Sequence, residues 1–353
     1  MDKHKNKTPK YLAAKAKLAE SIRHGLITNK LPGERILAEQ FGVSYMTMRK
    51  TIESLVDDGY LLKKSTKGTF VNSCDVPKKK TANIAFFLSE NIIDGISSPY
   101  YSLFFKALEK RLHRTDYHLI YISDEKDLDV KVCEEKYDGL IISYFPWLED
   151  YIAKLSQVIP VVLIDNPSDN VAAKYVGMNN YEGVYSAVKY LNNLKHTEIA
   201  YITGSLNNKI GQDRLNGYKA AIDDFNLKTT KQYIIQGDYG YESGYQAALS
   251  LVSYKTPPTA IVCSNDTMAF GAMKAIREYG LQVPEDISVI GFDNIELCSQ
   301  VYPSLTTIAA PIKEITDKAI ESLMFCLQGE ELDLEDIEVP TRLVIRKSCS
   351  PRK

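Results

Sequence analysis

Polar side chains follow several strand-like runs of the chain, close to the point where each run ends. Asp165 comes after VVLI, Asn265 and Asp266 come after AIVC, and Asp293 comes shortly after SVIG. In open parallel sheets, ligands bind beyond the carboxyl ends of the strands, so these carboxylates and amides are candidate ligand contacts. The chain has no GxGxxG and no GxxxxGK[S/T] motif, the glycine-rich patterns that bind dinucleotides and phosphates. The predicted ligand is therefore polar and either uncharged or weakly charged.

The elements that must position these side chains are strands and helices in alternation. Val- and Ile-rich runs separated by amphipathic segments are typical of parallel sheets that helices cover on both faces. Strands are expected at residues 84–88, 118–122, 139–142 and 161–164, and in a second set at 199–202, 233–235, 260–263 and 287–290. Helices are expected at 101–112, 181–194, 213–225, 241–254 and 267–279. The two sets predict two α/β lobes.

Charge divides the chain into a basic end and an acidic remainder. Residues 1–80 contain 17 Lys or Arg and 8 Asp or Glu, a net charge of +9, whereas the remainder carries −11. A compact basic domain favours a polyanion, because each phosphate that it neutralises releases condensed counterions. An acidic remainder repels nucleic acid. Composition alone leaves open the alternative that the basic end is a solvated lysine-rich tail.

Length and residue usage limit the class of protein further. At roughly 100 to 200 residues per domain, 353 residues suggest two or three folding units. No stretch approaches the ~18 uncharged apolar residues of a membrane span, and the first residues lead into no apolar run, so we expect a soluble cytoplasmic protein. The six cysteines lie at least 23 positions apart, and the five histidines show no HxxxH or HExxH spacing. This spacing predicts reduced thiols, no metal site and no cofactor.

The basic end has the pattern of a helix-turn-helix followed by a hairpin. Helices are expected from residue 8 to the Gly at 25, from 34 to 41 and from 45 to 58, where Ser44 caps the third helix. Short strands are expected at 60–64 and 69–71, with a turn at 65–68. The residues off the apolar stripe of the third helix lie in its first two turns, where a recognition helix faces the major groove. They are Tyr45, Thr47, Arg49 and Lys50.

Residues 31–71, LPGERILAEQFGVSYMTMRKTIESLVDDGYLLKKSTKGTFV, resemble the DNA-binding domain of the GntR family over its whole length. The resemblance implies an α+β winged helix-turn-helix fold and double-stranded DNA as a partner. Carried over position by position, it implies DNA contacts from Arg35, Ser44, Thr47, Arg49, Lys67 and Gly68. Lys50 joins this set because of its place on the third helix.

Three positions of this segment have a second interpretation. Many family members have arginine directly after the serine, whereas this chain has Tyr45, which can contact a thymine methyl group or a phosphate instead. Arg35 could form a surface ion pair with Glu39, four residues on, and Arg49 could do so with Glu53. Each pairing would stabilise the helix surface without any role in DNA binding.

The acidic remainder resembles the LacI/GalR regulators and the related periplasmic sugar-binding proteins over roughly residues 83–348. The matching strings include SPYYSLFFKALE, IPVVLID, RLNGYKAAI, PPTAIVCSNDTMAFGAMKAIREYGLQVPEDISVIGFDN and PSLTTI. The resemblance implies two lobes joined by three crossovers, with a helix at 312–327 returning to the first lobe and residues 342–345 to the second. The predicted domains are a winged helix-turn-helix at 1–72, a linker at 73–82 and a two-lobed sugar-binding and dimerisation domain at 83–348.

The same resemblance implies a monosaccharide site, because carboxylates, amides and a guanidinium bind sugar hydroxyls and aromatic rings cover the apolar face. Asp266 could instead cap the helix expected at 267, and the tyrosines could be ordinary half-buried residues. By resemblance, hydroxyl contacts fall to Asp165, Arg214, Asn265, Asp266 and Asp293, and ring packing to Tyr100 and Tyr101. Tyr144 and Trp147 follow another strand end and are weaker candidates for ligand contact.

Together these features predict a sugar-responsive transcription regulator and not an enzyme. The hypothesis is a repressor of carbohydrate utilisation genes that binds a pseudo-palindromic operator as a homodimer and is released by the sugar. The order of its domains resembles that of arabinose-responsive repressors, which implies L-arabinose as the effector. The alternative is a sugar-binding receptor with no DNA role. An enzyme is disfavoured because the chain shows no activated nucleophile motif and no metal ligand set.

Overall fold

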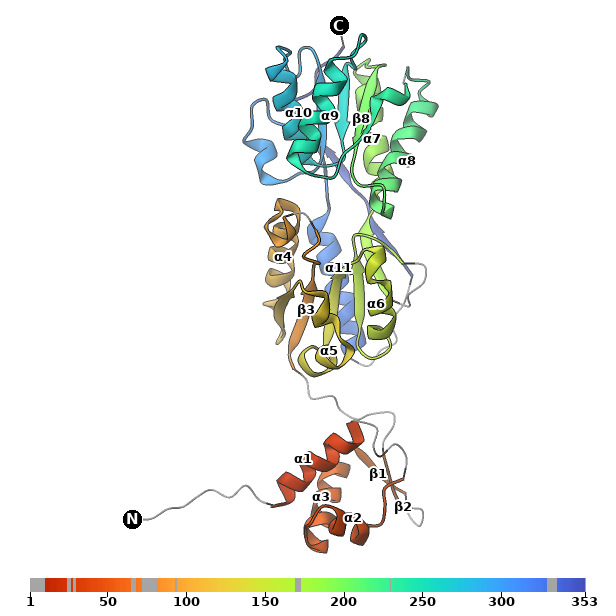
Figure 1. Ribbon diagram of the computed structural model, residues 1–353, viewed down its shortest axis with the longest axis vertical. Helices are drawn as coiled ribbons and strands as arrows, with labels where there is room; N and C mark the ends of the chain where they lie inside the picture. The colour runs from red at the N-terminus through yellow and green to blue at the C-terminus, as the bar shows by residue number, and fades with distance from the viewer. Residues whose placement is uncertain are drawn as a thin grey trace, which may run out of the picture. The chain divides into compact units, whose positions relative to one another are not determined.

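The computed structural model describes residues 10–23, 27, 30–64, 68–71, 81–92, 94–168, 173–228, 230–328 and 335–352. The chain divides into two compact units, Met1–Lys80 and Thr81–Lys353, here called the N-terminal and C-terminal units (Figure 1). The predicted fold class, a winged helix-turn-helix followed by two α/β lobes, is confirmed. Residues 72–80, which hold most of the predicted linker, lie outside the described residues.

The N-terminal unit packs three helices against a small antiparallel hairpin. Its elements are α1 (Lys10–Arg23), α2 (Glu34–Gln40), α3 (Tyr45–Asp57), β1 (Leu61–Lys64) and β2 (Gly68–Val71). The turn between α2 and α3 is tight because Gly42 adopts a φ of 61°, a left-handed conformation that glycine accepts without strain. Ser44 then caps α3, since its Oγ accepts a hydrogen bond of 3.2 Å from the Thr47 amide.

The C-terminal unit contains two lobes, and the first is built on a sheet in which every pairing is parallel. The described strands of this sheet lie in the order β13-β7-β6-β5-β3-β4. They are β3 (Asn83–Phe87), β4 (His118–Ile122), β5 (Gly139–Ser143), β6 (Val161–Ile164), β7 (Lys174–Met178) and β13 (Ile337–Val339). The helices of this lobe are α4 (Pro99–Leu112), α5 (Val130–Lys136), α6 (Glu149–Leu155) and α11 (Ile312–Leu327).

The second lobe repeats this plan with one antiparallel edge strand. Its described strands lie in the order β14-β12-β11-β10-β8-β9, and β14 runs antiparallel to β12. They are β8 (Ile199–Thr203), β9 (Ile234–Gln236), β10 (Ala260–Cys263), β11 (Ser288–Asp293), β12 (Thr306–Ala309) and β14 (Arg342–Val344). The helices are α7 (Asn180–Asn193), α8 (Lys209–Asp224), α9 (Tyr241–Val252) and α10 (Asp266–Glu278).

Within the described residues the chain passes between the lobes three times, after β7, after β12 and between β13 and β14. α11 packs on α4 in the first lobe, and β14 joins the sheet of the second, as the sequence predicted. β7, β12 and β13 were not among the expected strands, because their short runs lack a long stretch of Val and Ile. Residues that follow β6 in the first lobe and β8, β10 and β11 in the second line one cavity, so the crossovers bring these predicted site residues together.

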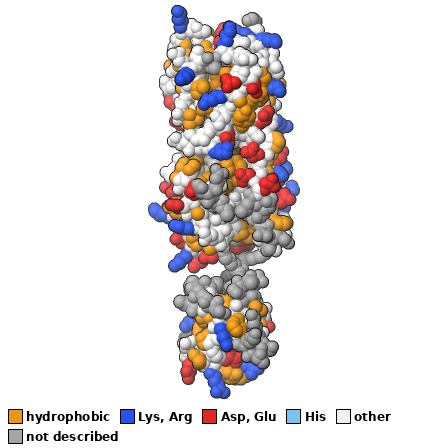
Figure 2. All heavy atoms as spheres, turned by 90° about the vertical axis from the view of Figure 1, so that its right-hand side faces the viewer, with side chains coloured by type: hydrophobic (Ala, Val, Ile, Leu, Met, Phe, Trp, Pro, Cys, Tyr) orange, Lys and Arg blue, Asp and Glu red, His pale blue; other side chains and the backbone are white. Residues whose placement is uncertain are grey.

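The described part of the chain gives no sign of a membrane span or a metal site. None of its helices combines the length and the apolar character that crossing a bilayer requires. No cluster of three or more His, Cys, Asp or Glu side chains within it could hold a metal ion. Figure 2 shows basic, acidic and apolar side chains interspersed over one face of the C-terminal unit.

Candidate functional site

The first turn of α3 presents an exposed and partly apolar surface. Met46 is 67% exposed and Tyr45 is 41% exposed, whereas Met48, Ile52 and Leu55 of the same helix are buried. The hydroxyl groups of Ser44 and Thr47 lie 2.8 Å apart at the same end of the helix. Sequence analysis had not singled out Met46, and its place directly after Tyr45 at the start of the helix is the signal that could have found it.

Cationic side chains surround this surface, and most are held by a neighbour. The Arg35 guanidinium lies over the ring of Tyr45, at 6.0 Å from the centroid, and the Lys50 Nζ lies over the ring of Tyr11 at 4.3 Å. Arg49 Nε donates to Glu53 Oε1 at 3.2 Å, so the predicted alternative of a surface ion pair is formed. Glu53 binds Arg49 through Nε, and neither terminal amino group of the guanidinium has a hydrogen bond to a described residue, so both can bind another partner.

The hairpin adds only a few described residues to this surface. Gly68 is exposed at the start of β2 with a φ of 111°, and Lys67 lies outside the described residues. Lys63 Nζ in β1 lies 4.0 Å from Glu53 Oε1, the carboxylate that also pairs with Arg49. Ser44, Tyr45, Thr47, Arg49 and Lys50 therefore lie together at one end of α3, and Arg35 joins them through the ring of Tyr45.

The C-terminal unit has a cavity of about 500 Å³ between its two lobes. Most of the polar residues that follow the strand ends line it, together with aromatic side chains from both lobes. From the sequence-predicted set, the cavity lining includes Tyr100, Tyr101, Trp147, Asp165, Arg214, Asn265 and Asp293. Sequence analysis missed other lining residues, among them Phe145, Asn208, Asp238, Tyr239, Tyr241 and Phe270.

Asp165 follows β6 directly, and it lies at the floor of this cavity on the side of the first lobe. Its backbone φ is 69°, a left-handed conformation that turns the carboxylate away from the strand direction. The carboxylate accepts hydrogen bonds from Tyr100 Oη at 3.1 Å, Tyr101 Oη at 3.2 Å and Ser143 Oγ. Burial raises the pKa of Asp165, whereas these hydroxyl donors and the charge of Arg214 lower it.

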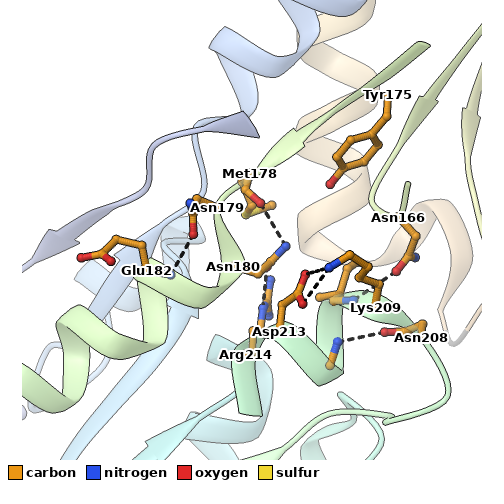
Figure 3. A network of polar contacts seen from close by, with 12 residues as sticks. Asn166, Tyr175, Met178, Asn179, Asn180, Glu182, Asn208, Lys209, Asp213 and Arg214 are labelled. Atoms are coloured by element: carbon orange, nitrogen blue, oxygen red, sulfur yellow. Dashed lines mark hydrogen bonds and ion pairs between the residues drawn. The ribbon is translucent and has the colours of Figure 1, made fainter. Parts of the chain in front are cut away.

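Arg214 enters the cavity from α8 in the second lobe and is 4% exposed. Its Nε donates to Asn180 Oδ1 at 2.8 Å (Figure 3). Its Nη1 donates to the carbonyl oxygen of Ser264, and its guanidinium lies 3.7 Å from the ring centroid of Phe292. Asn179 caps α7, whereas the neighbouring Asn180 orients Arg214. The guanidinium is therefore fixed before any ligand arrives.

Asp293 ends β11 opposite Asp165. Its φ is 110° and the φ of Asn294 is 60°, so the chain turns sharply there. Its carboxylate has no hydrogen bond to any residue that the structure describes. Burial is the main cause that raises its pKa well above the ordinary value; the charge of Arg214 lowers it, and the charges of Asp266 and Asp165 raise it further. An open carboxylate beside a fixed guanidinium can bind a hydroxyl group that both donates and accepts.

Two predicted ligand residues take other roles. Asp266 is fully buried and is absent from the cavity lining, because Oδ2 accepts from the Ile295 amide at 2.9 Å and Oδ1 from Thr307 Oγ1 at 2.5 Å. It does not cap α10 either, since Asn265 does so by accepting from the Met268 amide. Tyr144 is 2% exposed and packs in the core of the first lobe instead of lining the cavity. We therefore leave Asp266 and Tyr144 out of the ligand contacts.

Tyr239 is the most informative residue that sequence analysis missed. Its hydroxyl oxygen is buried and has no hydrogen-bond partner among the described residues. A side chain at Gly204 would place a Cβ atom 2.0 Å from Cζ of this ring, so glycine is required there for the ring to fit. Burial raises the pKa of Tyr239 to about 12, which keeps the hydroxyl protonated and able to donate. The turn GDYG that precedes α9 was its only signal in the sequence.

Each unit matches a known protein family, and relatives that span most of the chain are transcriptional repressors. The family described as "Bacterial regulatory proteins, gntR family" matches residues 10–71, and the family described as "Periplasmic binding protein-like domain" matches residues 188–349. The probable HTH-type transcriptional repressor ExuR of Bacillus subtilis (strain 168) is 33% identical over 282 residues, which cover 79% of this chain and 84% of the relative. The chain belongs to the HTH-type transcriptional repressors. It joins a GntR-type DNA-binding domain to a LacI-type effector domain.

Other relatives of this repressor are also transcriptional repressors or regulators. The HTH-type transcriptional repressor PurR of Vibrio vulnificus (strain CMCP6) is 33% identical over 275 residues, or 75% of this chain and 78% of that protein. A LacI family transcriptional regulator from Enterococcus faecium, solved with bound ribose, superposes with a TM-score of 0.67 at 26% identity, covering 77% of this chain and 100% of that one. The relatives are transcriptional repressors and regulators, so this repressor is not an enzyme.

Proposed function

We propose that the protein is a cytoplasmic, sugar-responsive repressor of carbohydrate utilisation genes. The observation that carries the proposal is the cavity between the two lobes, in which Asp165, Arg214 and Asp293 converge on one space in a chain that also has a recognition helix. Carboxylates flanking a fixed guanidinium suit the vicinal hydroxyls of a sugar, because each hydroxyl can donate to one and accept from the other.

The proposed effector is a monosaccharide unit, with L-arabinose as the first candidate. Tyr100 and Tyr101 lie with their rings at the cavity, where they can cover the apolar face of a sugar ring. The ribose bound to the Enterococcus faecium relative supports a pentose. L-arabinose itself rests on the similarity in domain order to arabinose-responsive repressors.

The proposed DNA target is a pseudo-palindromic operator that two copies of the chain bind together. Two-fold symmetric recognition helices require half-sites one helical turn or a multiple of it apart. Arg35, Arg49 and Lys50 are the proposed cationic contacts of each half-site, Ser44 and Thr47 the proposed phosphate contacts, and Lys67 and Gly68 the contacts of the hairpin. Tyr45, which is 41% exposed, is the proposed contact to a thymine methyl group.

The proposed response is release from the operator. A sugar that contacts both walls stabilises the closed arrangement of the lobes, and it changes operator affinity only by the difference between its affinities for the two arrangements. The sugar should therefore lower operator affinity, and the typical size of such coupling is about 5- to 150-fold.

Two measurements on the full-length protein test this proposal. A thermal-shift screen against monosaccharides should raise the melting temperature with one sugar, because a ligand that binds only the folded state stabilises it. A mobility-shift titration on DNA fragments from near its own gene should then show salt-sensitive binding that the same sugar weakens. Operator affinity that stays the same at every sugar concentration would contradict the proposal.

A further inference from the structure

The cavity extends from a polar floor to a mouth that combines large apolar side chains with polar ones. Asp165 and Arg214 at the floor are 6% and 4% exposed, whereas three large apolar side chains in the lining are much more exposed. They are Trp147 of the first lobe at 49%, and Leu297 and Tyr241 of the second lobe at 45% and 39%. The exposed lining residues also include Asn91, Asp94, Asn207 and Asp238, so the mouth offers both apolar surface and polar groups.

Trp147 is held in place although half of its surface is exposed. Its ring stacks on Phe145, with centroids 4.8 Å apart and an angle of 18° between the planes. Its indole nitrogen donates to Glu125 Oε1 at 3.1 Å. The same oxygen accepts from Ser89 Oγ at 3.1 Å and from Asn91 Nδ2 at 3.2 Å, so the acceptor is itself fixed.

A fixed, half-exposed indole at the edge of a cavity suits a flat apolar partner. Because its orientation is set before binding, little conformational entropy is lost when a ring covers it. Covering the exposed indole also removes apolar surface from water, which is favourable in proportion to the area covered. The C–H face of a sugar ring is such a partner, and the hydroxyl groups on the edge of that ring can stay in water.

We propose that Trp147, backed by Phe145, forms an outer subsite for a second ring, joined by a glycosidic bond to the sugar held at the floor. The natural effector is then a disaccharide or a longer glycoside whose terminal unit occupies the floor. This inference rests on the proposed function, because the floor must hold a sugar for the outer subsite to receive its neighbour. Leu297 and Tyr241 of the second lobe line the same cavity and would contact the second ring from the side opposite Trp147.

The test compares matched sets of ligands by isothermal titration with the full-length protein. Each set contains a monosaccharide, its methyl glycoside and its disaccharide: L-arabinose with arabinobiose, D-xylose with xylobiose, and D-glucose with cellobiose. In the set that binds, the disaccharide should bind about tenfold more tightly than the methyl glycoside, which has the same linkage without a second ring. Trp147→Ala should remove this advantage and leave the affinity for the monosaccharide within about twofold.

Two further variants keep the test decisive. Trp147→Phe retains an aromatic ring without the bond to Glu125 and should keep part of the advantage even if the alanine variant folds poorly. Phe325 in α11 is 51% exposed, outside the cavity lining, so Phe325→Ala is a matched control that should change no affinity. Trp147 is the one tryptophan of the chain, so its fluorescence should change more with the disaccharide than with the methyl glycoside.

The possible outcomes separate this inference from the proposed function. A monosaccharide that binds as tightly as its disaccharide would overturn the outer subsite and leave the sugar-responsive repressor standing. Equal weakening of all three ligands by Trp147→Ala would also overturn it, because Trp147 would then act on the first ring or on lobe closure. If no member of any set binds, the proposed sugar effector fails, and the outer subsite fails with it.

Discussion

Asp165 and Asp293 are both carboxylates in left-handed backbone at strand ends, but their surroundings differ. Asp165 on the first-lobe wall of the cavity accepts hydrogen bonds from Tyr100, Tyr101 and Ser143. On the second-lobe wall, the carboxylate of Asp293 and the hydroxyl of Tyr239 have no such partner within the described ranges. A ligand must share existing bonds at the first wall and can form new bonds at the second. The second wall should therefore contribute most of the ligand affinity.

The largest effect should come from Asp293→Asn, which keeps the shape and removes the acid. The amide nitrogen of Asn cannot accept a hydrogen bond from a sugar hydroxyl, and leaving that hydroxyl unpaired costs roughly 1–3 kcal/mol, so we expect sugar affinity to fall by about 10- to 100-fold. Operator binding should remain, and the sugar should no longer release it. Titration calorimetry and mobility shift measure the two effects. If the variant lost operator binding but kept its sugar affinity, Asp293 would not belong to the ligand wall.

Tyr239→Phe should have the next largest effect on affinity. The buried hydroxyl gains a partner only when the ligand is present, so its removal should weaken sugar binding about 3- to 10-fold. The free energy of unfolding should stay the same or rise slightly, because an unpartnered buried polar atom is lost. Chemical denaturation and calorimetry on the same sample test both parts. A clear loss of stability would show that the hydroxyl is already bonded in the free protein.

Tyr101→Phe should lower the stability of the protein and barely change sugar affinity, the reverse of what we expect for Tyr239→Phe. Its hydroxyl is bonded to Asp165 before the ligand arrives, so we expect unfolding to become about 1 kcal/mol easier. Sugar affinity should change by no more than about threefold, because the other donors keep Asp165 in place. Tyr185→Phe is a matched control, since that hydroxyl bonds Asp224 at the surface. A tenfold loss of affinity in Tyr101→Phe alone would remove the distinction between the two walls.

The smallest effect should be a dependence of stability on pH. Burial raises the pKa of Asp293 in the folded protein, so the folded state keeps a proton that the unfolded chain releases near pH 4. Stability contributed by the protonated form is lost as the pH rises from about 4 through the folded pKa. Asp293→Asn should thus melt roughly 2–4 °C higher than the natural protein at neutral pH, and the gap should close below about pH 4. A constant gap across this range would argue against a raised pKa.

Much of the cavity could be predicted from the sequence because strand ends in parallel sheets meet at one edge. This rule placed Asp165, Asn265 and Asp293 correctly in the lining. It failed for Tyr144 because adjacent residues after a strand point to opposite sides, and here Phe145 faces the cavity and Tyr144 the core. Only the structure shows which side each one takes.

Other parts of the site could not be predicted in this way. Asp266 is the first residue of α10, and its carboxylate accepts a hydrogen bond from the loop at residues 293–295 instead of facing the cavity. Tyr239 reaches the cavity through a turn whose left-handed φ of 73° has no signature in the residue type. The ring lies where it does because Gly204, from a different strand end, leaves room for it. Such contacts between distant segments depend on packing that no local pattern encodes.

The three passages of the chain between the lobes affect the order in which the C-terminal unit can be completed during synthesis. The first sheet includes β13, which is made 159 positions after the end of β7, and the whole second lobe except β14 is made in between. At about 5–20 residues per second, the nascent first lobe lacks its last strand for on the order of ten seconds. During that interval the edge of β7 that β13 later covers is open to chaperones or to a wrong partner strand.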